Sequence, residues 1–128
     1  MNNQTEIRAL IVEKDERVAG AIQKMLEDRH YRVTPLSRKE DATRLLKERP
    51  ISLAVAGETE DSDSPFHTMK EIVMASPMTS LILITDLPKE EVDNKAEGYG
   101  ILGHTGRSVR SEDMIPLLES FEKILSAF

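Results

Sequence analysis

The sequence predicts a single α/β domain over residues 1–128, with a doubly wound parallel sheet of five strands between two layers of helices. Strand-like and helix-like segments alternate along the whole chain, and this alternation favours right-handed crossovers and a parallel sheet. The strongest strand segment, residues 81–84, is apolar at every position, as is typical of a central parallel strand covered on both faces. The length fits one compact domain, with its core expected over about residues 7–125.

The strands are expected where short apolar or β-branched runs end at charge or glycine. Residues 7–12 form a short run rich in β-branched residues that is followed by charge, Val33 marks a short second strand, and residues 51–56 are small and apolar. After the central run at 81–84, a weak, glycine-rich fifth strand is expected at residues 103–107. Because the carboxyl ends of parallel strands share one edge of the sheet, the polar residues that follow these strands should meet there.

The helices are expected from apolar stripes and from the residues that begin them. Residues 15–29 carry apolar side chains three and four positions apart. Ser37 opens a Ser-x-x-Glu capping-box pattern that predicts the second helix, and Ser64 followed by proline predicts the third. A fourth helix should follow the fourth strand. Pro116 predicts Asp113 as the cap of the last helix, because proline is tolerated only in the first turn.

Composition excludes several classes of function. The net charge of -6 repels phosphate backbones, and with only 2 Tyr, 3 Phe and no Trp there are few aromatic rings for stacking bases. The absence of cysteine excludes disulfides and thiolate metal sites. No apolar run approaches the roughly 18 residues that span a bilayer, and the first residues lack the apolar stretch of a signal peptide. We therefore expect a cytoplasmic chain without nucleic-acid or membrane partners.

Several motifs share the spacing of a known family. An acidic cluster, residues 13–16, follows the first strand, Thr85 ends the fourth, and a Gly-Ile-x-Gly stretch at residues 100–103 precedes the fifth. In this spacing the chain resembles the receiver domain of bacterial two-component response regulators, over nearly its whole length. The resemblance implies a flavodoxin-like three-layer sandwich with strand order 2-1-3-4-5 and a role in phosphorelay signalling.

The residues that would form the family's phosphorylation pocket depart from its pattern. In receivers, two adjacent acids after the first strand and an aspartate after the third hold magnesium, and that aspartate is the nucleophile. Glu13 matches the first acid, Lys14 replaces the second, and Asp15 follows one position later. Gly57 falls at the nucleophile and has no side chain to phosphorylate. Only Glu13 and Asp15 would remain as carboxylate ligands, so we expect no cofactor and doubtful magnesium binding.

The other pocket positions are occupied by polar residues. Thr85 matches the family's switch hydroxyl, although we expect it mainly to cap the next turn; Arg107 falls at the position of the phosphate-binding lysine, and His104 at the switch aromatic. We expect Arg107 to pair with nearby acids, with an anion as the alternative ligand. Two interpretations of Lys14 stay open: an inward cation that substitutes for magnesium, or a solvated loop residue. A solvated acidic loop is expected from Glu58, Glu60, Asp61 and Asp63.

These features predict a pseudo-receiver that signals by binding proteins and is not an enzyme. Candidate partners are a histidine kinase, an output domain, or a second copy of the chain. By resemblance, the docking face would consist of the fourth helix, the fifth strand and the fifth helix. Residues expected on or near that face are Val92, Tyr99, Val109 and Phe121.

Two alternatives lead to other activities. The first is a conventional magnesium-dependent receiver that is phosphorylated on another acid, such as Glu58. The second is a small flavodoxin-like or nucleotide-binding enzyme. That enzyme would need a Gly- or Ser/Thr-rich phosphate loop after the first strand, where this chain has charged residues.

Overall fold

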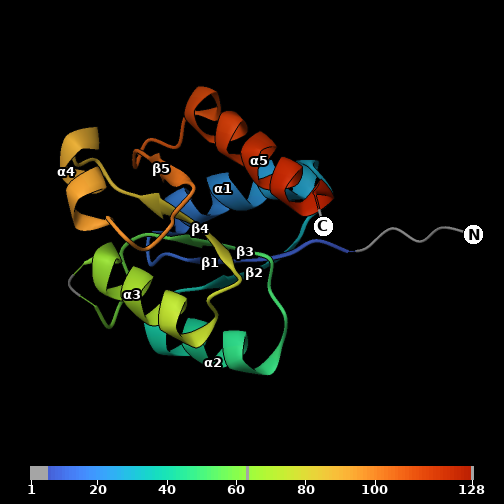
Figure 1. The fold of residues 1–128 in the computed structure, drawn as a ribbon, viewed down its shortest axis with the longest axis horizontal. Coiled ribbons are helices and arrows are strands. Elements are labelled where there is room, and N and C mark those ends of the chain that lie inside the picture. Colours follow the sequence, from blue (N-terminus) through green and yellow to red (C-terminus); the bar gives the residue numbers. More distant parts are fainter. Residues whose placement is uncertain (1–5, 63, 128) are drawn as a thin grey trace, which may run out of the picture.

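The structure, a computed structural model, describes residues 6–62 and 64–127. Its elements follow in the order β1 (Arg8–Val12), α1 (Glu16–Asp28), β2 (Arg32–Leu36), α2 (Lys39–Glu48), β3 (Leu53–Ala56), α3 (Pro65–Ala75), β4 (Ser80–Ile84), α4 (Lys89–Lys95), β5 (Gly103–Thr105) and α5 (Ser111–Ser126). The strands form one parallel sheet in the order β2-β1-β3-β4-β5. Figure 1 shows this sheet between two layers of helices. The predicted fold class and strand order are confirmed.

The central strands bury both of their faces. Alternate residues of β1, such as Ala9 and Ile11, pack with α1 and α5, whereas Leu10 and Val12 pack with α2, α3 and α4. β3 and β4 divide their side chains between the same two cores, and all eight of these strand residues from 53–56 and 81–84 are buried. This two-sided burial explains why residues 81–84 are apolar at every position.

Two helices begin where the sequence predicts. Asp15 is the N-cap of α1, and its carboxylate accepts hydrogen bonds from the N–H groups of Arg17 and Val18. Ser64 is the N-cap of α3, where its hydroxyl accepts from the N–H of Phe66. A proline follows Ser64 at the first helical position, where no N–H is required.

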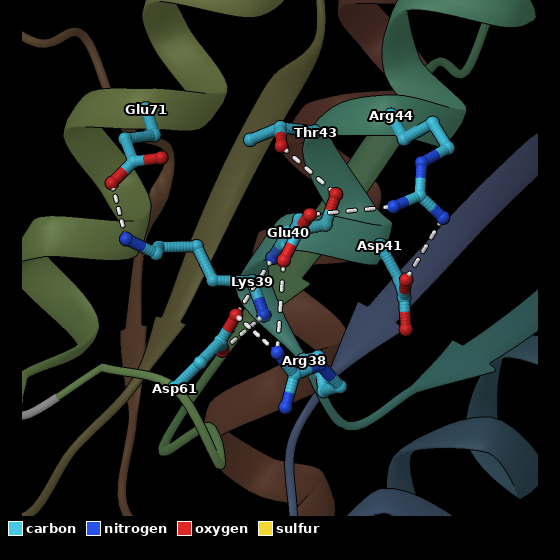
Figure 2. A network of polar contacts seen from close by, with 8 residues as sticks. All are labelled: Arg38, Lys39, Glu40, Asp41, Thr43, Arg44, Asp61 and Glu71. Carbon is cyan, nitrogen blue, oxygen red and sulfur yellow. Dashed lines mark hydrogen bonds and ion pairs between the residues drawn. The ribbon is translucent and has the colours of Figure 1, made fainter.

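The predicted cap of α2 is wrong. Its N-cap is Arg38, which makes no side-chain capping bond, and the free N–H groups of the first turn are bonded instead by Asp61. Figure 2 shows the Asp61 carboxylate reaching this helix end from the loop after β3. A Ser-x-x-Glu pattern describes only a local cap, so it cannot detect a cap that comes from a distant segment.

The expected solvated loop is therefore wrong for Asp61, whose side chain is 18% exposed. Glu58 and Glu60 are exposed, as the sequence predicts. The fourth acid of this group, Asp63, lies outside the described residues.

The predicted start of α5 is also wrong. The helix begins at Ser111, after Arg110 as its N-cap, so Asp113 lies within the first turn and Pro116 lies inside the helix. Pro116 cannot donate to the carbonyl oxygen of Glu112. Both residues are exposed, so water can satisfy that carbonyl, which explains how the helix tolerates this proline.

The fifth strand is shorter than the sequence predicts. β5 ends at Thr105, and the chain then turns back through residues 106–109, where the N–H of Val109 bonds to the carbonyl of Gly106 at 3.1 Å. Val109 has a φ of 53°, an uncommon conformation for a β-branched residue. This turn places Arg107 at the carboxyl edge of the sheet.

Among the helices that the structure describes, none is long and apolar enough to cross a bilayer.

Candidate functional site

The carboxyl edge of the sheet brings together the residues that follow four strands. Glu13 follows β1, Gly57 follows β3, Thr85 follows β4 and Arg107 lies in the turn after β5. Backbone hydrogen bonds hold the carboxyl ends of neighbouring strands together. For example, the N–H of Gly57 donates to the carbonyl of Val12 at 2.9 Å. The sequence-based prediction that these positions share one edge is thus supported by their place in the fold.

Glu13 lies at the centre of this edge. Its side chain has no solvent exposure, and both of its carboxylate oxygens accept hydrogen bonds. Oε1 accepts from the N–H of Glu58 at 3.0 Å and from Nη1 of Arg107 at 2.9 Å. Oε2 accepts from the N–H of Asp15 at 2.8 Å and from Nη2 of Arg107 at 2.9 Å. Four donors therefore compensate one buried charge.

Arg107 forms a bidentate ion pair with Glu13. The guanidinium is 20% exposed, and its Nε also lies 3.7 Å from Oε2 of Glu58. The N–H of Arg107 donates to Oδ1 of Asp86 at 2.8 Å, which fixes the backbone at the start of the turn. The hydrogen bonds to Glu13 raise the pKa of Arg107 above its ordinary value. The expected pairing of Arg107 with nearby acids is confirmed.

Gly57 has no room for a side chain. A Cβ atom built on it would overlap Oε1 of Glu13 and would lie 3.1 Å from Cδ1 of Ile84. The carboxylate of Glu13 thus occupies the space into which a side chain at position 57 would project. The space beside Gly57 is therefore not an empty gap.

The side chains of Lys14 and Asp15 do not join the ion pair between Glu13 and Arg107. Lys14 is exposed and forms no ion pair within the described part of the chain, so its interpretation as a solvated loop residue is confirmed. The cation beside Glu13 is Arg107. Oδ1 of Asp15 caps α1, and the hydrogen bond from Val18 is the largest contribution that lowers the pKa of Asp15. No cluster of three potential metal-binding side chains occurs in residues 6–62 and 64–127.

Thr85 caps the turn that precedes α4. It is buried, and its hydroxyl accepts a hydrogen bond from the N–H of Leu87 at 3.2 Å. Its own N–H bonds to the carbonyl of Thr105 at 2.9 Å, which continues the β4–β5 pairing. The expected capping role of Thr85 is therefore confirmed.

A groove lies beside this edge, between α4, β5 and α5. Its volume is about 690 Å³, and its lining includes Val92, Thr105, Leu117 and the half-buried His104. The hydroxyl of Thr105 is buried and has no hydrogen-bond partner among the described residues. The groove is lined by both apolar and polar side chains.

The four residues expected on or near this face differ in burial. Val92 is buried and borders the groove, and Tyr99 is half-buried against the core beneath α4. Val109 and Phe121 are buried in the core between the sheet and α1 and α5. Whether these residues contribute to a docking face stays a prediction.

Two hydrogen-bonded contacts near this edge could not be predicted from the sequence. Asp86 anchors the backbone of Arg107, and Asp61 caps α2. Both contacts join residues about twenty positions apart through a carboxylate and a backbone N–H. Backbone donors are present at every residue except proline, so residue types alone do not identify the pair.

Comparison with solved structures identifies the architecture. The chain superposes on a CheY-like response regulator receiver domain protein from Methanospirillum hungatei with a TM-score of 0.82 and 16% identity, over 97% of this chain and 100% of the other. The chain has the receiver fold. The signal receiver domain of an HD domain-containing protein from Pseudomonas fluorescens gives a TM-score of 0.83 at 18% identity, over 99% and 94% of the two chains.

The receiver fold recurs in a response regulator from Thermotoga maritima, with a TM-score of 0.77 and 14% identity over 91% of this chain and 98% of that one. No family model matches the sequence, and no curated protein matches it. At these identities the likeness extends to the fold, and the chemistry must be argued from the residues at the carboxyl edge.

Proposed function

We propose that this chain is a receiver-fold signalling domain that acts by docking to proteins, without phosphorylation and without enzymatic activity. The observation that carries the proposal is the buried pair of Glu13 and Arg107 beside Gly57. The carboxylate fills the space of a side chain at position 57, and the guanidinium already neutralises it. An incoming phosphoryl group would find no nucleophile at position 57, and the guanidinium of Arg107 is already paired.

Magnesium binding is also not part of the proposed function. Magnesium requires several oxygen ligands in a nearly octahedral arrangement. Each oxygen of Glu13 is occupied by two donors, and Oδ1 of Asp15 caps α1. The residues at this edge therefore do not fit the ion.

Glu58 is the acid that a conventional phosphorylated receiver would have to use here. Its side chain is 49% exposed, and its carboxylate lies near Arg107 at the mouth of the pocket. The guanidinium of Arg107 is already paired with Glu13, and the other cation of this edge, Lys14, is exposed and forms no ion pair with Glu58 in the described part of the chain. An acyl phosphate on Glu58 would thus lack the stabilisation that transfer of a phosphoryl group needs.

Incubation with magnesium and a small phosphodonor, followed by intact mass measurement, tests this proposal. We expect no mass gain of one phosphoryl group. A suitable positive control is the response regulator from Burkholderia pseudomallei, whose structure contains a phosphorylated aspartic acid. A stable phosphoryl adduct on this chain would overturn the proposal, and its loss in Glu58→Gln would favour the conventional receiver.

The proposed docking surface is the groove between α4, β5 and α5. Its lining is partly apolar, and its rim includes the exposed acids Asp93 and Asp113, of which Asp93 pairs with Lys89 at 2.7 Å. We infer a protein partner with apolar and basic side chains, because these complement the walls and the rim. A histidine kinase, an output domain and a second copy of this chain are the candidates.

Reversal of charge on the rim tests the docking surface. Asp93→Lys combined with Asp113→Lys should abolish the capture of specific partners from the native organism and any self-association in sedimentation. The control, Glu16→Lys with Asp28→Lys, makes the same charge change on exposed positions of α1. If the rim variant is folded and retains every partner of the unaltered chain, the docking surface is elsewhere.

A further inference from the structure

The loop between β3 and α3, residues 57–62 and 64, is attached to its surroundings along its described length. The N–H of Lys14 donates to the carbonyl of Glu58 at 2.7 Å, and the N–H of Glu60 donates to the carbonyl of Ser37 at 2.9 Å. An isolated antiparallel bridge joins Thr59 to Ser62 within the loop. These backbone bonds attach the loop to the segments after β1 and β2.

Asp61 adds the strongest attachment. Its Oδ1 accepts from the N–H of Lys39 at 2.6 Å, and its Oδ2 accepts from the N–H of Glu40 at 3.1 Å. The amino end of α2 carries unsatisfied N–H groups and a partial positive charge, so it binds a carboxylate well. Arg38, 3.9 Å from Oδ2, adds a full positive charge. Partial burial would raise the pKa of Asp61, but these donors outweigh it and lower the pKa.

The same helix end is also joined to α3. The ammonium group of Lys39 forms an ion pair with Glu71 of α3, and this hydrogen bond raises the pKa of Lys39. The side chain of Lys39 is 20% exposed, so solvent screens this pair less than a fully exposed one. Figure 2 shows the ion pair and the Asp61 cap meeting at the first turn of α2. Residue 39 therefore binds the loop through its backbone and α3 through its side chain.

We propose that Asp61 fastens the β3–α3 loop to α2 and α3, so that these segments form a rigid block beside the carboxyl edge. In this arrangement Glu58, whose N–H bonds to Glu13, is held in one position. The block keeps the edge of the sheet in a single conformation without any bound ligand.

Hydrogen exchange of the backbone amides tests this inference in the full chain. Asp61→Ala removes both acceptors from the end of α2. We expect the amides of Lys39, Glu40 and Glu60, which are hydrogen-bonded in the structure, to exchange at least about tenfold faster, because local opening then loses its main opposing interactions. Amides in β1 and β4 should keep their protection, which would show that the fold is intact.

Glu60→Ala is the matched control. It removes the same charge from the neighbouring exposed position and keeps the N–H that bonds to Ser37. Asp61→Asn, which retains one oxygen acceptor, should give an intermediate change and serves as a second variant if Asp61→Ala fails to fold. Equal exchange in the Asp61 and Glu60 variants, or unprotected loop amides in the unaltered chain, would overturn the inference.

Discussion

Gly57→Asp should destabilise the fold by about 3 kcal/mol, and it should not create a phosphorylation site. The new Cβ would overlap Oε1 of Glu13, and the carboxylate of Glu13 accepts from four donors, two on each oxygen, and cannot move freely. The new carboxylate would also lie beside a buried carboxylate of the same charge. Urea denaturation measures the loss of stability, and the phosphodonor experiment measures the absence of phosphorylation.

Two further glycine variants separate crowding from charge. Gly57→Ala should still cost about 2 kcal/mol, because the overlap begins at Cβ. Gly20→Ala is the control: Gly20 lies within α1, with nothing within 4 Å of its added Cβ. It should stabilise the chain by about 0.5–1 kcal/mol. If Gly57→Ala is also neutral or stabilising, then Glu13 does not fill the pocket in solution.

A double variant tests whether Glu13 is the residue responsible. In Glu13→Ala with Gly57→Asp, the new carboxylate gains the space and the guanidinium that Glu13 has vacated. We expect the double variant to be more stable than Gly57→Asp alone, with a coupling energy of at least about 1 kcal/mol. If the double variant loses as much stability as the two single variants together, the side chains at positions 13 and 57 do not compete for one space.

Arg107→Ala should lower the free energy of unfolding by about 3 kcal/mol at neutral pH. The side chain of Glu13 has no solvent exposure, so removal of its cation leaves a buried charge with only two backbone donors. Breaking such a pair is costly because the remaining carboxylate stays desolvated. Chemical denaturation of the variant and the unaltered chain gives the difference directly.

Arg110→Ala is the matched control for Arg107. Arg110 lies three residues later and pairs with Glu112, but both of these side chains are largely exposed. Exposed ion pairs contribute little, because water and salt screen them. We therefore expect no clear change in stability for Arg110→Ala. Similar losses in the two variants would show that the burial of Glu13 does not determine the effect.

The fold could be predicted because the information lies in short stretches of the chain. Residues 81–84 are buried on both faces of β4, and their uniform apolar character alone indicates a central parallel strand. The stripe of Val18, Ile22 and Leu26 predicts the buried face of α1. The predicted strand order, confirmed by the structure, came from the resemblance to receivers and not from these patterns.

The candidate site was only partly predictable. The sequence predicts that polar residues and Gly57 meet at the carboxyl edge of the sheet. It also predicts that Arg107 pairs with a nearby acid, but it does not identify which one. Glu13 occupies the space beside Gly57 because of how three strands pack together. A local sequence pattern contains no information about this packing. The Asp61 cap was missed for a related reason, since it joins a loop carboxylate to backbone N–H groups 21 and 22 residues away.

The pairing of Glu13 with Arg107 has a consequence for how such a domain can be regulated. Under the proposed function, a domain that carries its own counter-charge would not respond to the supply of phosphodonors or divalent cations. Under the proposed function, its occupancy on a partner follows mass action alone. The cell would then adjust the signal through the amounts of the two proteins, by synthesis and degradation, and not through a reversible chemical mark on this chain.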